Sequence, residues 1–152
     1  MRLTRHSDYA LRVLLFVGTA EGRLVTVGAI AERFGISRNH LMKVVNRLAV
    51  HGFVETVRGK HGGIRLAVAP EALSIGVLLR CTEADFTLTE CFSDQGQGCR
   101  IAGSCAVRAV LDEALAAFLA VLDRYTLADL LDNRGALAED LALTDGQALA
   151  PG

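Results

Sequence analysis

Hydrophobic positions in the first fifty residues recur with a helical period and predict three helices. The first covers residues 7–20 with Ser7 as its N-cap, and the second covers residues 27–34 and ends at Gly35 in a left-handed turn. The third begins after the cap Ser37, and the apolar positions on its buried face are Leu41, Val44, Val45 and Leu48. A short helix, a glycine turn and a longer helix with a polar start are typical of a helix-turn-helix.

Two short β-prone runs follow the third helix. They are FVETV at residues 53–57 and IRLAV at residues 64–68, and the glycine-rich hexapeptide RGKHGG joins them. Glycines in a short connection between such runs predict a β-hairpin. The fold class is therefore expected to be mainly α, a winged helix-turn-helix with a two-stranded wing.

The C-terminal half predicts a helix at residues 74–82, a polar segment without hydrophobic period, and a long helix at 105–124 capped by Ser104. The long helix carries a wide apolar stripe, formed by Val107, Val110, Leu111, Ala114, Leu115, Phe118, Leu119 and Leu122. A single helix with that much apolar surface needs a partner, which predicts dimerisation. A short helix is expected at 125–132, and residues 133–152 are expected to be a disordered tail.

The overall composition favours a globular protein inside the cell. The chain has 152 residues, of which 51% are hydrophobic, so a packed core is expected. No apolar run approaches the ~18 residues of a membrane span. The apolar run near the start is short, contains Arg12 and is not followed by a small-residue cleavage site, so it is not a signal peptide. We therefore expect a cytoplasmic protein without a membrane partner.

The charges are distributed unevenly, although the formal net charge is only −1. Residues 1–68 carry eleven Lys or Arg and four acids, a net of +7. Residues 69–152 carry five Lys or Arg and thirteen acids, a net of −8. A basic N-terminal half is typical of a protein that binds a polyanion, although chance segregation gives the same pattern.

The start of the third helix carries side chains suited to DNA bases. In a helix-turn-helix, the second helix of the pair enters the major groove and its N-terminal residues meet base edges. The residues at these positions are Ser37, Arg38, Asn39 and His40. Arg forms two hydrogen bonds with guanine, and Asn forms two with adenine. Lys43 and Arg47 lie one and two turns further along, where phosphates or bases are within reach.

The predicted hairpin tip adds a second basic element. Its candidate DNA-binding residues are Arg58, Lys60, His61, Gly62 and Gly63. Small residues let the backbone approach the duplex, and a cation can enter a narrow minor groove. Taken singly, each candidate has an ordinary explanation as a helix cap, a solvated charge or a turn glycine. The motif spacing and the basic half together predict binding to double-stranded DNA.

Three cysteines lie close together in the polar segment, with the spacing Cys91-x7-Cys99-x5-Cys105. Cytosolic thiols are kept reduced, so the group indicates a metal site before a disulfide framework. The spacing is looser than the paired gaps of a zinc ribbon and suits a loop around a larger iron cluster. Cys105, at the expected start of the long helix, is placed where a thiolate is favoured. Cys81 falls in the apolar run VLLRC and is interpreted as a small buried hydrophobe.

The residues alone leave the fourth ligand open. No His follows Cys105 closely, because position 108 is Arg. The acids near in sequence are Glu83, Asp85, Glu90 and Asp94. A residue from another subunit is a further candidate.

Three stretches of the chain resemble the family of iron–sulfur winged-helix repressors that includes NsrR and IscR. They are MRLTRHSDYALR, ISRNHLMKVVNRLAVHGFVETVRGKHGGIRL and the three-cysteine segment, and the resemblance covers roughly residues 1–130. It implies a homodimer whose long C-terminal helices cross, with the cluster near the dimer interface. The IscR branch is expected to have His where this chain has Arg108. The NsrR branch is expected to complete a 4Fe-4S cluster with an Asp in the first helix of the other subunit, which Asp8 matches; Arg12 can pair with Asp8.

The resemblance also implies a function. The expected protein is a repressor, not an enzyme, whose cluster reacts with nitric oxide and whose affinity for a palindromic operator then falls. The alternatives are a regulator that senses redox state or cluster supply with a 2Fe-2S cluster, and a structural zinc protein. The expected organisation is a DNA-binding domain at 1–69, a cluster-binding loop with dimerisation helices at 70–132, and the tail.

Overall fold

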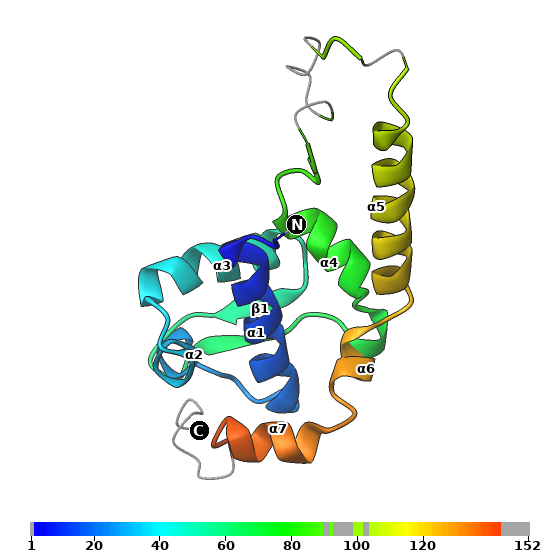
Figure 1. Ribbon diagram of the computed structural model, residues 1–152. Helices are drawn as coiled ribbons and strands as arrows, with labels where there is room; N and C mark the ends of the chain where they lie inside the picture. Colours follow the sequence, from blue (N-terminus) through cyan, green and yellow to red (C-terminus); the bar gives the residue numbers. More distant parts are fainter. Residues whose placement is uncertain (1, 90–91, 93–98, 102–103, 144–152) are drawn as a thin grey trace.

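The computed structural model describes residues 2–89, 92, 99–101 and 104–143 (Figure 1). The N-terminal elements follow the predicted order of three helices and a hairpin, which confirms the winged helix-turn-helix. These elements are α1 (Arg5–Thr19), α2 (Val27–Phe34), α3 (Arg38–Val50), β1 (Val54–Val57) and β2 (Gly63–Leu66). The two strands are antiparallel, and an isolated bridge from Val25 to Ile64 ties the chain before α2 to the wing.

The start of α1 differs from the prediction. Thr4 is the N-cap, and its hydroxyl accepts a hydrogen bond of 3.3 Å from the Ser7 backbone N–H. Ser7 itself is fully buried within the helix, and its hydroxyl shares a 2.8 Å hydrogen bond with the hydroxyl of Thr82. The prediction of Ser7 as the cap is therefore wrong, because Thr4 offers the same capping chemistry three residues earlier.

The turn between α2 and α3 has the predicted form. Thr26 caps α2 by accepting a 3.1 Å hydrogen bond from the Ala29 N–H, and Gly35 ends it with a φ of 61°. A side chain at Gly35 would be strained in this left-handed conformation. Ser37 occupies the N-cap position of α3, but its side chain makes no capping hydrogen bond.

The second half of the chain adds helices that pack on the winged helix-turn-helix. They are the 3₁₀ helix η1 (Pro70–Ala72), α4 (Ile75–Thr82), α5 (Val107–Asp123), α6 (Leu127–Leu130) and α7 (Arg134–Asp140). One hydrophobic core joins both halves, because Phe16 of α1, Leu78 of α4 and Leu127 of α6 belong to the same buried cluster. Residues before and after position 69 thus share a core, and we call the unit built around this core, without α5, the body.

The segment expected to be a disordered tail contains α7. This helix packs near the end of α1, where Arg134 donates a 2.7 Å hydrogen bond to the Glu21 carboxylate. Leu141 and Leu143, just beyond α7, are buried. The expectation of disorder is wrong for residues 134–143, and residues 144–152 lie outside the described part.

The long helix α5 begins later than predicted and lies along the side of the body (Figure 1). Ala106 is its N-cap residue, whereas the Ser104 hydroxyl donates to the Ile101 carbonyl at 3.5 Å. The prediction that Ser104 caps this helix is therefore wrong. No residue of α5 is buried, and Val107 and Val110 of the predicted stripe are 58% and 62% exposed. Within the described residues, no helix is long and apolar enough to cross a membrane.

Candidate DNA interface and cysteine site

The outer face of α3 holds the residues predicted to contact DNA. Its apolar face is fixed in the core by Leu41, Val44, Val45 and Leu48. The predicted contact residues on the opposite side are all exposed, and they are Ser37, Arg38, Asn39, His40, Lys43 and Arg47. Burial of one helix face thus presents the polar face to the solvent, as entry into a major groove requires.

The wing presents its basic residues at the tip of the hairpin. Arg58, Lys60 and His61 are exposed between β1 and β2. The two glycines that follow have a structural reason of their own. A Cβ on Gly63 would lie 2.8 Å from the Val25 carbonyl oxygen, and one on Gly62 would collide with the backbone of Val57. Close packing against Val25 therefore accounts for Gly63, and the tight backbone of the hairpin tip accounts for Gly62, without any ligand.

The cysteine site is described in part. Cys99 is exposed and Cys105 is partly buried, and both are free thiols. Cys91 lies outside the described residues. Among the residues that are described, no three His, Cys, Asp or Glu side chains come together as a metal site. Two free, accessible thiols have the donor chemistry that iron or zinc requires, so this part of the site fits a metal group.

Cys81 differs from the loop cysteines. It is partly buried and packs against the hydrophobic core, as expected for a small apolar side chain. Its carbonyl oxygen accepts a 3.0 Å hydrogen bond from Arg47 Nε. The backbone of Cys81 therefore contacts α3 directly, a role that the sequence pattern did not indicate.

Arg108 anchors the first turn of α5 to the cysteine segment. Its guanidinium lies 5.7 Å from the ring centroid of Phe92, the residue after Cys91. The same guanidinium is 3.9 Å from the Asp112 carboxylate. Arg108 thus carries a positive charge beside the segment, where a ligand histidine would otherwise stand.

Asp8 lies on α1 and is engaged within its own chain. Arg12 Nε donates a 3.0 Å hydrogen bond to the Asp8 carboxylate, and the Arg12 and Asp8 side chains are 43% and 46% exposed. The Arg12 guanidinium also lies 5.6 Å from the ring centroid of Phe34 on α2. The carboxylate of Asp8 is therefore accessible, and any ligand role would compete with its pairing to Arg12.

The other candidate acids are engaged or lie outside the described residues. The Thr87 backbone N–H donates to the Asp85 carboxylate at 2.9 Å, and this hydrogen bond holds the pKa of Asp85 below its usual value. Glu83 accepts hydrogen bonds from the backbone N–H and the hydroxyl of Thr4, at 2.9 and 3.1 Å. Glu90 and Asp94 are outside the described residues.

The end of α4 forms a junction with α1 and α3, immediately before the cysteine segment. We call Thr4, Ser7, Arg47, Thr82 and Glu83 the junction residues. Thr4 bonds to Glu83, Ser7 bonds to Thr82, and Arg47 bonds to the Cys81 carbonyl. Sequence patterns gave no sign of the roles of Thr4, Thr82 and Glu83, because the partners of these residues are distant in sequence. The junction connects the helix that carries Asp8, the predicted recognition helix α3 and the start of the cysteine segment.

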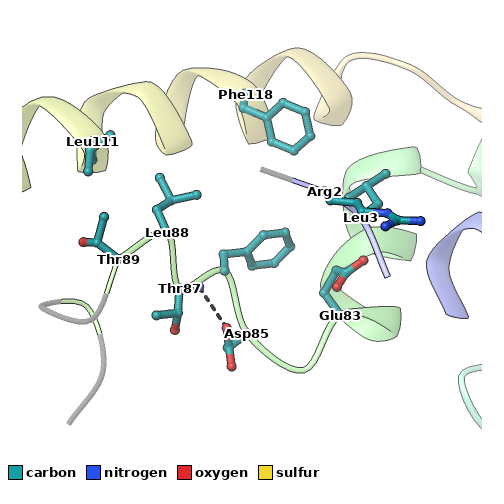
Figure 2. A pocket seen from close by; sticks show the side chains of 10 residues that line it. Arg2, Leu3, Glu83, Asp85, Thr87, Leu88, Thr89, Leu111 and Phe118 are labelled. Atoms are coloured by element: carbon teal, nitrogen blue, oxygen red, sulfur yellow. Dashed lines mark hydrogen bonds between the residues drawn. The ribbon is translucent and has the colours of Figure 1, made fainter. Parts of the chain in front are cut away.

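A pocket of about 330 Å³ lies between this junction and α5. Figure 2 shows Arg2 and Leu3 at one end, the segment 83–89 along one side, and Leu111 and Phe118 of α5 along the other. Leu88 points toward α5, and Asp85 is joined to Thr87 by the hydrogen bond described above. The segment that leads to the cysteines and α5 therefore form opposite sides of one pocket.

Comparison with protein families matches residues 3–133 to the Rrf2 family, described as an iron-dependent transcriptional regulator. Two similar relatives are each named HTH-type transcriptional regulator NsrR. The relative from Bacillus subtilis (strain 168) is 50% identical over 135 residues, which cover 88% of this chain and 92% of the relative. The relative from Geobacillus kaustophilus (strain HTA426) is 49% identical over 138 residues, which cover 90% and 94%.

Solved structures support the same fold. The oxidized form of Staphylococcus aureus CymR is 26% identical, with a TM-score of 0.71, and the match covers 87% of this chain and 97% of that one. T. potens IscR is 23% identical, with a TM-score of 0.70, over 100% and 94% of the two chains, a likeness that shows the fold alone. The named relatives are transcriptional regulators, not enzymes. This chain therefore belongs to the Rrf2 family, as a DNA-binding transcriptional repressor of the NsrR type.

Proposed function

We propose that this repressor is a cytoplasmic homodimer that senses nitric oxide through an iron–sulfur cluster and releases a palindromic operator in response. The observation that carries the proposal is the junction at the end of α4. It bonds the start of the cysteine segment to α1 and to α3. A change in the cysteine segment therefore has a short, hydrogen-bonded route to the helix that faces DNA.

We assign the cluster ligands to Cys91, Cys99 and Cys105 of one subunit and Asp8 of the partner subunit, around a 4Fe-4S cluster. The free thiols of Cys99 and Cys105 and the accessible carboxylate of Asp8 support this assignment. Arg108 in place of a histidine favours it over a 2Fe-2S cluster held by a nearby imidazole. When bound, the cluster supplies iron with which nitric oxide reacts.

Asp8 is suited to be the ligand that is lost. A single carboxylate is a weaker iron ligand than a thiolate, because iron–sulfur clusters are held mainly by cysteine sulfur. Arg12 already offers the carboxylate an alternative partner at 3.0 Å. Transfer of Asp8 from the metal to Arg12 would uncouple the two subunits and let their recognition helices shift. A coupling free energy of roughly 1–3 kcal/mol is typical of such switches.

The dimer is proposed from the surface of α5. One edge of its apolar stripe is open within one chain, because Val107, Val110 and Val121 are 58%, 62% and 43% exposed. The leucines of the stripe and Phe118 are partly buried. Exposed valines at 107 and 110 lie three positions apart and so share one face of the helix. Pairing of this face with a second copy would place two α3 helices at a fixed separation, which a palindromic operator requires.

Operator binding by anaerobically purified protein, titrated with nitric oxide and followed by absorption, tests the proposal. We expect a coloured protein whose operator affinity falls as the cluster absorption changes. Cys99→Ala should lose the iron, whereas the matched variant Cys81→Ala should keep it. Unchanged iron content in Cys99→Ala would reject the ligand assignment. The alternative of redox or cluster-supply sensing would be favoured by a coloured protein with a 2Fe-2S Mössbauer spectrum whose operator affinity does not change with nitric oxide.

A further inference from the structure

A basic hollow lies beside the recognition helix, between the first turn of α1 and the first turns of α3. Its volume is about 330 Å³, and it is lined by Arg5, His6, Tyr9, His40, Lys43 and Val44. On the α1 side, Tyr9 also packs against the hydrophobic core, whereas Arg5 and His6 have no part in the proposed cluster site. We call these six residues the basic hollow.

Two uncompensated cations border the basic hollow. Neither Arg5 nor Lys43 has an ion pair or hydrogen bond with any residue in the described part of the chain. No acid lines the hollow, and two acids near it are already engaged. Asp8 is paired with Arg12, and Glu83 is bonded to Thr4. An anion entering the hollow therefore meets positive charge without local competition.

His6 contributes to the shape of the basic hollow more than to its charge. Its partial burial and the nearby charge of Arg47 lower the pKa of His6 from its usual 6.5, while Glu83 opposes this shift. The ring is therefore mostly neutral at neutral pH. Tyr9 is partly buried one turn after Arg5, and its side chain forms part of the wall.

The hollow lies beside α3, the helix expected to enter the major groove. The major groove is about 12 Å wide, close to the 10–12 Å diameter of an α-helix with its side chains. A helix in the groove is therefore flanked closely by both phosphate backbones. The wing lies next to α3 in the chain, and the hollow opens along the α3 side that carries His40 and Lys43, facing the start of α1.

We propose that the basic hollow binds a backbone phosphodiester of the operator, with Arg5 and Lys43 supplying charge and the Tyr9 hydroxyl a hydrogen bond. This inference rests on α3 being the helix that enters the major groove. A phosphate contact of this kind fixes register and orientation without reading sequence. It also places Asp8 between two phosphate-binding residues, Arg5 and Tyr9, on one turn of α1. Movement of that turn on loss of the Asp8 ligand would withdraw the phosphate contact at the same time.

The salt dependence of binding tests the proposal with full-length, anaerobically purified protein. Fluorescence anisotropy would measure affinity for the operator duplex and for a scrambled duplex at several salt concentrations. The variants are Arg5→Gln and Tyr9→Phe, with Arg124→Gln as control at an exposed arginine beyond α5. Asn39→Ala serves as the comparison for a base contact.

One lost phosphate contact has a defined signature. We expect Arg5→Gln to weaken both duplexes equally, by roughly fivefold to tenfold near 0.1 M salt, and to reduce the slope of log K against log salt by about 0.9. Tyr9→Phe should weaken both duplexes by a smaller factor, with little change in slope. Arg124→Gln should match wild type. Asn39→Ala should instead reduce the preference for the operator and leave the slope unchanged.

Each other outcome contradicts a specific part of the inference. An unchanged slope in Arg5→Gln, with Asn39→Ala still losing preference, would overturn the hollow and retain α3 as recognition helix. A normal preference in Asn39→Ala would overturn the orientation of α3. Thermal melting checks that each variant folds. A saturable rise in melting temperature with inorganic phosphate, lost in Arg5→Gln, would reassign the hollow to a small free anion.

Discussion

Two helices of similar length, α1 and α5, differ in how much of their surface one chain buries. α1 has 15 residues, and the buried ones are Ser7, Ala10, Val13, Leu14, Phe16, Val17, Gly18 and Thr19. α5 has 17 residues, and none of them is buried. Both carry apolar stripes of helical period. α1 is thus covered by its own chain, whereas α5 keeps an exposed apolar edge that contains Val107 and Val110.

The same contrast separates the predicted DNA-binding surface from the proposed cluster site. The body around α1 holds α3 and the wing rigidly in a close-packed core, as a surface that recognises DNA must be held. α5 lies outside this core and meets the body chiefly through α4, where Arg80 pairs with Asp123. Weakly packed elements are the ones that move at low free-energy cost. The part that carries the proposed cluster site is therefore attached to the core mainly through α4.

The largest effect is expected from a charge on the exposed face of α5. Val110→Asp alters a residue that is 62% exposed in one chain, so the monomer should still fold. In a dimer interface it would bury an unpaired carboxylate. We expect the dimer to dissociate and operator affinity to fall roughly 100- to 10,000-fold, because two linked half-site contacts become independent. Light scattering after gel filtration measures the oligomeric state.

The matched control for Val110→Asp is Val50→Asp. Val50 is 81% exposed at the end of α3, far along the chain from the α5 stripe. This variant should remain dimeric. A Val110→Asp protein that also stays dimeric would show that α5 is not the dimer interface.

Truncation of one apolar residue in each helix compares what α1 and α5 contribute to the free energy of unfolding. Phe16 is fully buried in α1, where its ring packs edge-on against Phe34 at 6.1 Å between centroids. Phe16→Ala should lower the free energy of unfolding by about 3–5 kcal/mol. Val107→Ala should change it by less than about 0.5 kcal/mol when measured in the monomeric Val110→Asp background. Urea unfolding of both variants gives the comparison, and equal losses would mean that α5 is part of the body.

The body could be predicted from sequence because its signals are local. The cap Thr26, the left-handed Gly35 and the buried face of α3 follow from residues within one or two turns. The hairpin follows from two β-prone runs around glycines. Local sequence signals therefore suffice to predict the winged fold and the exposed polar face of α3.

Contacts between distant residues could not be predicted in this way. Ser7 has the neighbours of a helix cap, yet its hydroxyl bonds to Thr82, which is 75 residues away. α7 has no clear hydrophobic period, and short helices of this kind are stabilised by packing against the rest of the protein. The α1 wall of the basic hollow escapes sequence-based prediction for the same reason, since only folding brings Arg5 and Tyr9 beside Lys43.

A substitution at the junction residue Glu83 is expected to have an intermediate effect on signalling. Glu83→Ala removes the acceptor for both hydrogen bonds from Thr4. We expect the ratio of operator affinities with and without the cluster to fall roughly fivefold, about 1 kcal/mol, because both lost hydrogen bonds are exposed and share one carboxylate oxygen. Glu83→Gln should restore part of the ratio, because its amide oxygen can still accept. Glu71→Ala, on the exposed η1, is the control, and an unchanged ratio in Glu83→Ala would remove the junction from the signalling route.

The smallest predicted effect concerns the bond that attaches α5 to the body. Two hydrogen bonds join the Arg80 guanidinium to the Asp123 carboxylate, at 2.5 and 2.8 Å, and they hold the pKa of Asp123 below its usual 3.8. Because the folded pKa is the lower one, the unfolded state binds the proton more readily. The stabilisation is therefore complete above pH 3.8 and is lost as the pH falls through the folded pKa.

Thermal melting between pH 6 and 3 would show this loss as a difference between wild type and Asp123→Asn. We expect the wild-type advantage to be small, because the pair is solvent-exposed, and to disappear on acidification. Asp132→Asn, at an exposed aspartate beyond α6, should show no such pH-dependent difference. A constant difference at all pH values would mean that the carboxylate charge does not hold α5. The hydrogen-exchange rate at the end of α5 should rise in Asp123→Asn while that of α1 stays unchanged, because only α5 depends on this bond.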